Sequence, residues 1–242
     1  MRGLLPIWRR ELAALFLGPL AWTLLFLALL FDGLWFVERL RAGAGDVDQA
    51  LRVAQVITFY VSVFGAPLVT MRMISEESRG GLLEYLLTAP VDDAAVVTGK
   101  FLAAVSFFAI LAGAIFLYAL ALAANGVAPD LGALAAGWLG LTLAAGLFCA
   151  IGLLASSATS TPIVAAFAAI VLDLGFVLAP QVAQLSPDSW PGRFAGRLDV
   201  TDHLSSSFLR GAVDSAHAAF FVAWTALFLF LAVRAVEARR WR

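Results

Sequence analysis

Long stretches without a charged side chain recur along this chain of 242 residues, and they restrict its fold more than any other feature. One of them begins after Lys100 and ends only at Asp130. About 20 consecutive apolar residues suffice for a helix to cross a bilayer. The chain is 62% hydrophobic and 14% charged, whereas soluble domains are about 45–50% apolar and about 25% charged. A soluble fold of this size has too little interior for that apolar surface. The sequence therefore predicts an integral membrane protein and excludes soluble enzymes, disordered proteins and, with a net charge of −1, nucleic-acid binders.

The apolar stretches predict an all-α, polytopic membrane protein with six transmembrane helices in one domain, 1–242. The expected spans are at about 20–37, 53–71, 97–123, 133–155, 163–180 and 217–235. A polar segment, 181–215, separates the last two spans and is broken by two prolines. Within it we expect Asp202 to cap a helix that begins near His203, with Phe208, Leu209 and Val213 on its apolar side.

The N-terminal residues 3–17 predict a helix that lies on the membrane surface. One side is apolar and includes Trp8, while Arg9 and Arg10 lie toward the other side. This pattern is typical of interfacial helices, and Gly18-Pro19 is expected to end it. The alternative is one long tilted span over 12–37 with a kink at Pro19.

Basic residues near the ends of the spans predict the orientation of the chain. More of them lie on the side of the N-terminus (Arg2, Arg9, Arg10, Arg72, Arg79, Lys100, Arg234, Arg239, Arg240, Arg242) than on the other side (Arg39, Arg41, Arg52, Arg193, Arg197, Arg210). Both termini are therefore expected to be cytoplasmic.

Residues 72–92 join the second and third spans with more polar chain than a crossing requires. Five of the 17 acidic residues lie here or directly after it: Glu76, Glu77, Glu84, Asp92 and Asp93. After Gly80-Gly81, four leucines make an apolar stripe. Such a helix is suited to a hydrophobic groove on a partner, with its carboxylates facing basic residues at the rim. The alternative is a helix that lies on the bilayer surface. The excess of acidic residues argues against this alternative, because the inner leaflet is itself anionic.

This segment resembles the ABC-2 permeases, in particular the gliding-motility-type (GldF-like) branch. The shared residues are Met71-Arg72, Glu76-Glu77, Arg79, Gly81, Glu84, Leu86-Leu87-Thr88, Pro90 and Gly99-Lys100-Phe101-Leu102. Leu82 stands where the family usually has threonine. A second likeness lies near the end of the chain, at His203, Phe208, Arg210-Gly211, Asp214, Glu237 and Arg239-Arg240-Trp241.

The resemblance implies an exporter subunit of the bacterial cytoplasmic (inner) membrane that pairs with a second permease copy, most simply as a homodimer, and binds a cytoplasmic ABC ATPase. It implies that 3–17 is an elbow helix, that 181–215 is an outer re-entrant hairpin, and that a coupling helix seats in the ATPase. The coupling residues would be Glu76, Glu77, Arg79, Gly81, Leu83, Glu84, Leu87 and Pro90. Membrane lipid and a periplasmic or accessory membrane protein are further expected partners; the substrate is unspecified.

The chain carries no phosphate-binding loop, which requires G-x-x-x-x-G-K-[ST]. Its one Gly-Lys, Gly99-Lys100, is followed by Phe101 and opens a membrane span. We therefore expect no catalytic residue, cofactor or metal on this chain, with ATP and Mg²⁺ on the partner ATPase. Lys100 itself is expected to snorkel to the interface.

Two acids, Asp32 and Asp173, are embedded in apolar sequence. Asp173 is near the middle of the fifth span and is a candidate pathway or subunit-contact residue, or a protonated or hydrogen-bonded packing residue. Asp32 is expected near the outer interface, where water would satisfy it. Because of these acids, a proton-coupled secondary transporter that uses Asp173 stays open as an alternative. A non-transporting membrane assembly subunit is a further alternative. Small residues of the fourth and fifth spans are expected to pair subunits.

Overall fold

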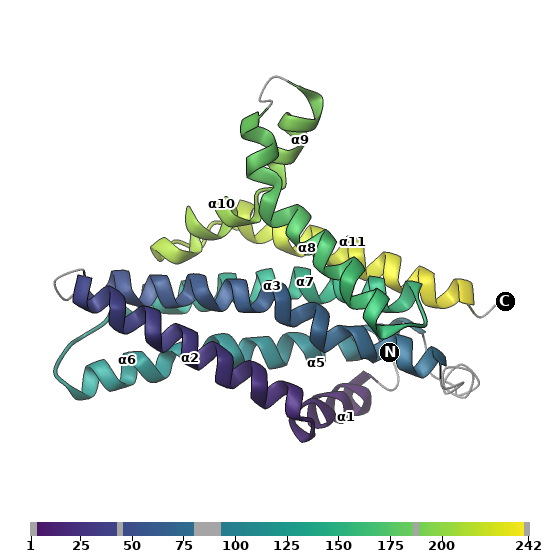
Figure 1. Cartoon of the computed structure of the whole chain (residues 1–242), viewed down its shortest axis with the longest axis horizontal. Coiled ribbons are helices and arrows are strands. Elements are labelled where there is room, and N and C mark those ends of the chain that lie inside the picture. Colours follow the sequence, from purple (N-terminus) through teal and green to yellow (C-terminus); the bar gives the residue numbers. More distant parts are fainter. Residues whose placement is uncertain (1–3, 43–45, 80–92, 186–188, 240–242) are drawn as a thin grey trace.

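The computed structural model describes residues 4–42, 46–79, 93–185 and 189–239, and these are almost entirely helical (Figure 1). The long helices are α2 (Pro19–Ala42), α3 (Val47–Arg79), α5 (Asp93–Gly113), α7 (Leu131–Ala158), α8 (Pro162–Leu185) and α11 (Ser215–Arg239). The shorter ones are α1 (Leu4–Leu17), α6 (Ile115–Ala124), α9 (Trp190–Arg197), α10 (Val200–Ser205) and the 3₁₀ turn η1 (Phe208–Arg210). We call the end of the bundle that carries α1 and the last residues of α3 and α11 the termini end, and the opposite end the loop end.

Six helical segments in the described part of the chain are long and apolar enough to cross a membrane. They are Pro19–Ala42, Val47–Glu76, Asp93–Ala124, Leu131–Ala158, Pro162–Leu185 and Ser215–Ala238. Each encloses one of the ranges expected from the sequence. The predicted fold class, all-α with six spans, is confirmed.

Helix α7 is the centre of the bundle and packs against α3, α5, α8 and α11. Glycines of α7 lie at the points where side chains of neighbouring elements come closest to its backbone. A Cβ on Gly152 would collide with the hydroxyl of Thr70, and one on Gly137 would collide with the amide of Gln55, both on α3. Glycine permits this close approach of backbones. These small residues of the fourth span are therefore occupied by contacts within the chain rather than left for a second subunit.

The third span is broken into α5 and α6, although one helix was expected over 97–123. The indole of Trp138 on α7 donates a hydrogen bond of 2.9 Å to the carbonyl of Ala109. That carbonyl is the regular helical acceptor for the N–H of Gly113. Directly after it, Ala114 donates to Leu111, three residues back. The break is thus explained by a side chain from another helix that competes for a backbone carbonyl.

Helix α1 ends at Leu17 and α2 begins at Pro19, so a continuous helix over 12–37 is not formed. The expected apolar side of α1 is half-buried against α5, while Arg9 and Arg10 are exposed. The approach is close: a Cβ on Gly99 of α5 would lie 2.8 Å from Ile7.

The segment between the last two spans forms three short elements. Helix α8 continues through Pro180 to Leu185, and α9 packs back against it. The expectation for Asp202 is wrong: α10 begins one turn earlier, and Asp199 is its N-cap, accepting from the N–H of Asp202 at 2.8 Å. An earlier start buries Val200 together with Leu204.

The element η1 and helix α10 connect this segment to the bundle core. Phe208 is fully buried on Gly140 of α7, where an added Cβ would lie 2.5 Å from the Phe208 side chain. Gly211 then takes a left-handed conformation, φ 87°, and ends the turn. Phe208 and Leu209 are buried, but on η1 rather than on the expected helix, because α10 ends at Ser205. Val213 is 57% exposed and lies after that turn.

We expect Gly152→Ala to lower the stability of the protein by about 1–3 kcal/mol, the usual range for overpacking a close contact. The measurement is the thermal unfolding midpoint in mild detergent. Gly175→Ala is the control, because nothing lies within 4 Å of a Cβ at that position. In a Thr70→Ala background, which removes the colliding hydroxyl, the penalty of Gly152→Ala should shrink. Equal shifts for Gly152→Ala and Gly175→Ala would contradict the packing described above.

Candidate functional site

The described ends of the predicted coupling segment, the last turns of α3 up to Arg79 and the start of α5 at Asp93, lie at the termini end. Glu76 is described and exposed, and it pairs with Arg72 one turn earlier at 3.3 Å. Glu77 and Arg79 belong to the last turn of α3, but their side chains lie outside the described residues. The other predicted coupling residues, Gly81, Leu83, Glu84, Leu87 and Pro90, lie outside the described residues entirely. The predicted helix there stays a prediction.

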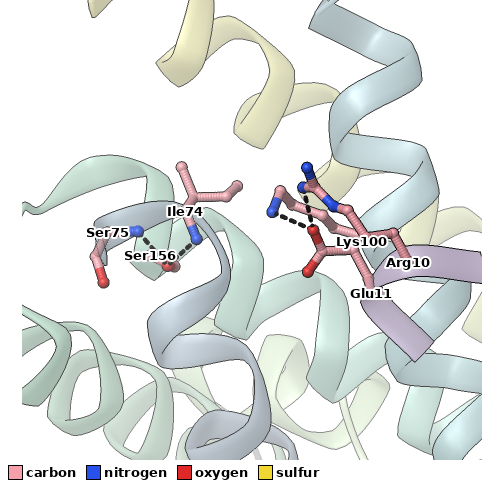
Figure 2. Close-up of polar contacts among 6 residues, drawn as sticks. All are labelled: Arg10, Glu11, Ile74, Ser75, Lys100 and Ser156. Atoms are coloured by element: carbon pink, nitrogen blue, oxygen red, sulfur yellow. Dashed lines mark hydrogen bonds and ion pairs between the residues drawn. The ribbon is translucent and has the colours of Figure 1, made fainter. Parts of the chain in front are cut away.

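Helix α3 is fixed to α7 directly before this segment by the hydroxyl of Ser156 (Figure 2). The Ser156 oxygen accepts from the N–H of Ile74 at 3.2 Å and from the N–H of Ser75 at 3.1 Å. The same hydroxyl donates to the carbonyl of Met71 at 2.9 Å. Ser156 is fully buried, so these bonds form away from water, where leaving a polar group unpaired is costly. The last described turns of α3 are therefore held to α7 by side chain–backbone bonds, in addition to apolar packing.

Helix α5 is fixed to α1 about two turns after its start at Asp93, by an ion pair between Lys100 and Glu11 (Figure 2). The Lys100 Nζ donates to Glu11 Oε1 at 3.0 Å, and Arg10 donates to the same oxygen at 2.6 Å. The side chain of Lys100 is 1% exposed. The expectation that Lys100 snorkels to the interface is wrong, because helix α1 covers it and supplies a carboxylate.

The electrostatics of Glu11 follow from this arrangement. Burial alone would raise the pKa of Glu11, but the positive charges of Lys100 and Arg10 and their hydrogen bonds outweigh it and hold that pKa below its ordinary value. Glu11 is consequently a carboxylate at neutral pH, which is the form that Lys100 requires as a partner.

Ser156 and the Glu11–Lys100 pair together define what we call the two clamps of the termini end. One clamp holds the helix that enters segment 80–92, and the other holds the helix that leaves it. A force on the segment would reach α7 through the first clamp and α1 through the second. The sequence did not reveal either clamp, since the partners are 81 to 89 residues apart.

Asp32 is not at a hydrated interface, as was expected, but buried between α2 and α3 with 1% exposure. Its Oδ2 accepts a hydrogen bond of 2.8 Å from the hydroxyl of Thr58. The other oxygen has no hydrogen-bond partner among the described residues. The carboxyl group of Asp32 is turned toward α3, where the Thr58 hydroxyl donates to it.

Asp173 is fully buried in α8, and neither carboxyl oxygen has a hydrogen-bond partner in the described part of the chain. Its neighbours Leu174, Val177 and Leu178 line a cavity, but Asp173 is not among the lining residues. No described residue hydrogen-bonds to Asp173, so a hydrogen-bonded packing role is not seen there, and the pathway, subunit-contact and protonated packing roles stay predictions.

Comparison with known proteins agrees with this architecture. The sequence profile described as ABC-2 family transporter protein matches residues 31–240. The chain belongs to the ABC-2 transporter family. A comparison with curated individual proteins finds no match. The resemblance noted from residues 71–102 is thus confirmed at the level of the family, and the chain is a membrane-spanning transporter subunit rather than an ATPase.

The described residues contain no group of three or more His, Cys, Asp or Glu side chains that could hold a metal ion. Two histidines that sequence spacing did not connect do meet: His203 Nδ1 of α10 lies 2.6 Å from His217 Nδ1 of α11. Burial, and then the charge of His217, lower the pKa of His203. The pair holds α10 against α11 and is too small a set for a metal site.

We expect Ser156→Ala to loosen the end of α3, because the buried N–H groups of Ile74 and Ser75 lose their bonds to the Ser156 hydroxyl, at about 1 kcal/mol each. The measurement is amide hydrogen exchange of residues 71–79, which should become faster. Ser157→Ala is the matched control, since Ser157 is equally buried and, among the described residues, its hydroxyl bonds within α7, to the carbonyl of Leu154. Unchanged exchange in Ser156→Ala would show that this clamp does not hold α3.

For the second clamp we expect Glu11→Gln to cost about 3 kcal/mol of stability, because it removes the Glu11 carboxylate from beside a buried lysine. In a Lys100→Met background the same change should cost much less. The coupling between the two changes should be full above pH 4.5, the ordinary pKa of Glu11, and should be lost as the pH falls through the lowered folded-state value. Unfolding midpoints of the four proteins between pH 3 and pH 7 measure it. Additive effects at neutral pH would contradict the ion pair.

Proposed function

We propose that this chain is the permease subunit of an ABC exporter that couples ATP hydrolysis by a separate cytoplasmic ATPase to movement of a substrate or to transmission of force. ATP and Mg²⁺ would be bound by the ATPase. Within the family, the shared residues at 71–102 favour the gliding-motility-type (GldF-like) branch. Substrate transfer would use the six spans, and residues 72–92 would receive the ATPase.

The observation that carries the proposal is the pair of clamps around segment 80–92. A coupling element must be short, must reach into a partner, and must be joined firmly to the helices that it moves. Ser156 fixes α3 before the segment, and Lys100 fixes α5 after it. Without such contacts a push on the segment would bend the helix ends instead of displacing the spans.

The surroundings of the protein are part of the same proposal. The distribution of basic residues supports cytoplasmic placement of the termini end, in the inner membrane of a bacterium. The family resemblance supports a second permease copy, an elbow role for α1 and an outer re-entrant position for 181–215. The exposed apolar side chains of α8, such as Ile163 and Phe167, are suited to lipid or to that second copy.

A second candidate function rests on Asp173. Asp173 is a fully buried carboxyl group within a membrane span, and intramembrane acids mark proton relays in pumps and transporters. A proton-coupled transporter would use it directly, without an ATPase. A non-transporting assembly subunit is the remaining alternative, and it would need neither Asp173 nor ATPase stimulation.

We expect Glu84→Arg to abolish stimulation of the partner ATPase, lowering the stimulated rate by about tenfold, because it reverses the charge presented to the partner. The ATPase is to be one that co-purifies with this chain, and the assay is its activity in proteoliposomes with and without the permease. Glu38→Arg is the matched control: it makes the same change at an exposed position of α2, toward the loop end.

The alternatives give different results in the same system. Transport that persists without any ATPase but disappears in Asp173→Asn would contradict the ABC proposal and favour proton coupling. Co-purification with an ATPase whose activity Glu84→Arg leaves unchanged would contradict the role of residues 72–92.

A further inference from the structure

A cavity of about 580 Å³ lies between α3 and α8 and is bounded on a third side by α10 and the residue before it. Figure 1 shows α8 crossing the bundle obliquely, with α10 beside it. The volume is in the range of sites that hold small organic molecules, about 300–1,000 Å³. The function proposed above assigns no ligand to it.

The walls of this cavity are apolar and aromatic. Tyr60 and Phe64 contribute from α3, one turn apart, and Leu174 and Leu178 contribute from α8, also one turn apart. Both aromatic side chains remain accessible, at 43% and 47% exposure. Aromatic faces of this kind attract cations as well as apolar groups.

The third side of the cavity is acidic. Asp199 and Asp202 both line it, and the lining includes no lysine, arginine or histidine. No ion pair to either carboxyl group occurs in the described part of the chain, although Asp199 accepts the capping bond from the N–H of Asp202. Two carboxyl groups at the end of an apolar cavity disfavour the binding of an anion, and a neutral acyl chain would make no use of their charge. They complement a positive charge.

We propose that this cavity binds a lipophilic monocation, with its apolar body between α3 and α8 and its positive charge toward Asp199 and Asp202. The part of this inference that makes the bound cation the transported substrate rests on the proposed function. Binding itself requires no ATPase and can be measured separately. The aromatic pair Tyr60 and Phe64 supplies the wall on which the cation and its apolar substituents lie.

The experiment uses the full chain in phosphatidylcholine nanodiscs, with tetraphenylphosphonium as the probe and calorimetric titration as the measurement. Tetraphenylborate has the same shape and the opposite charge, so it is the matched probe control, and empty nanodiscs give the lipid background. We expect tetraphenylphosphonium to bind saturably above that background and tetraphenylborate not to do so.

The charge is tested with Asp199→Asn combined with Asp202→Asn. Asparagine is as good an N-cap as aspartate, so α10 should keep its start, and an unchanged unfolding midpoint checks this. We expect the dissociation constant for tetraphenylphosphonium to rise at least about tenfold, the loss of two nearby opposite charges. Asp130→Asn is the control, because Asp130 is also an N-cap carboxylate, on α7, but lies outside the cavity.

The cavity itself is tested with Leu174→Trp, which fills it without changing its charge. This variant should also weaken binding, and it keeps the proposal testable if the double variant does not fold. Binding that neither variant weakens, or equal binding of tetraphenylborate, would overturn the inference. If binding follows the expected pattern but the ATPase is not stimulated by this chain, the site stands and the proposed function fails. If stimulation is present but tetraphenylphosphonium does not bind, this inference alone fails.

Discussion

The close contact between α3 and α7 is the interaction on which the rest of the structure depends. Lipid tails are as apolar as leucine, so helices in a membrane gain little from hydrophobic burial against one another and need tight van der Waals contact and hydrogen bonds. Gly137 and Gly152 provide the contact by letting side chains of α3 reach the backbone of α7. Ser156 then adds the hydrogen bonds at the termini end. With α7 placed in this way, α5, α8 and α11 have a common surface on which to pack.

The polar groups inside the bundle show a second constraint. Buried hydroxyls such as those of Ser62 and Thr70 bond to carbonyls of their own helix. The acids Asp32 on α2 and Glu11 on α1 instead find a partner on another helix, Thr58 on α3 and Lys100 on α5. Such pairs specify which helices are neighbours, because a different arrangement would leave the groups unpaired in an apolar medium. Asp173 departs from this pattern in the described residues, which is why it stays a candidate for function.

The segment that we propose to receive the ATPase joins two helices that are each fixed near their ends, one to the central helix α7 and one to α1. A displacement of the segment would therefore move the core and α1 together. Helix α3 links this route to the cavity between α3 and α8, because it carries both the contact with Ser156 and the aromatic wall formed by Tyr60 and Phe64.

The sequence by itself determined the membrane class, the six spans and the family, because these depend on local composition, segment length and a contiguous motif at 71–102. It also indicated the apolar side of α1, which is periodic over neighbouring turns. Only the tertiary structure decided that Lys100 is covered, that Asp32 turns toward Thr58, and that Trp138 interrupts the third span at Ala109. The physical reason is the same in each case: the deciding partner is distant along the chain, and an apolar run gives no signal of which neighbouring helix will supply a hydrogen bond or a charge.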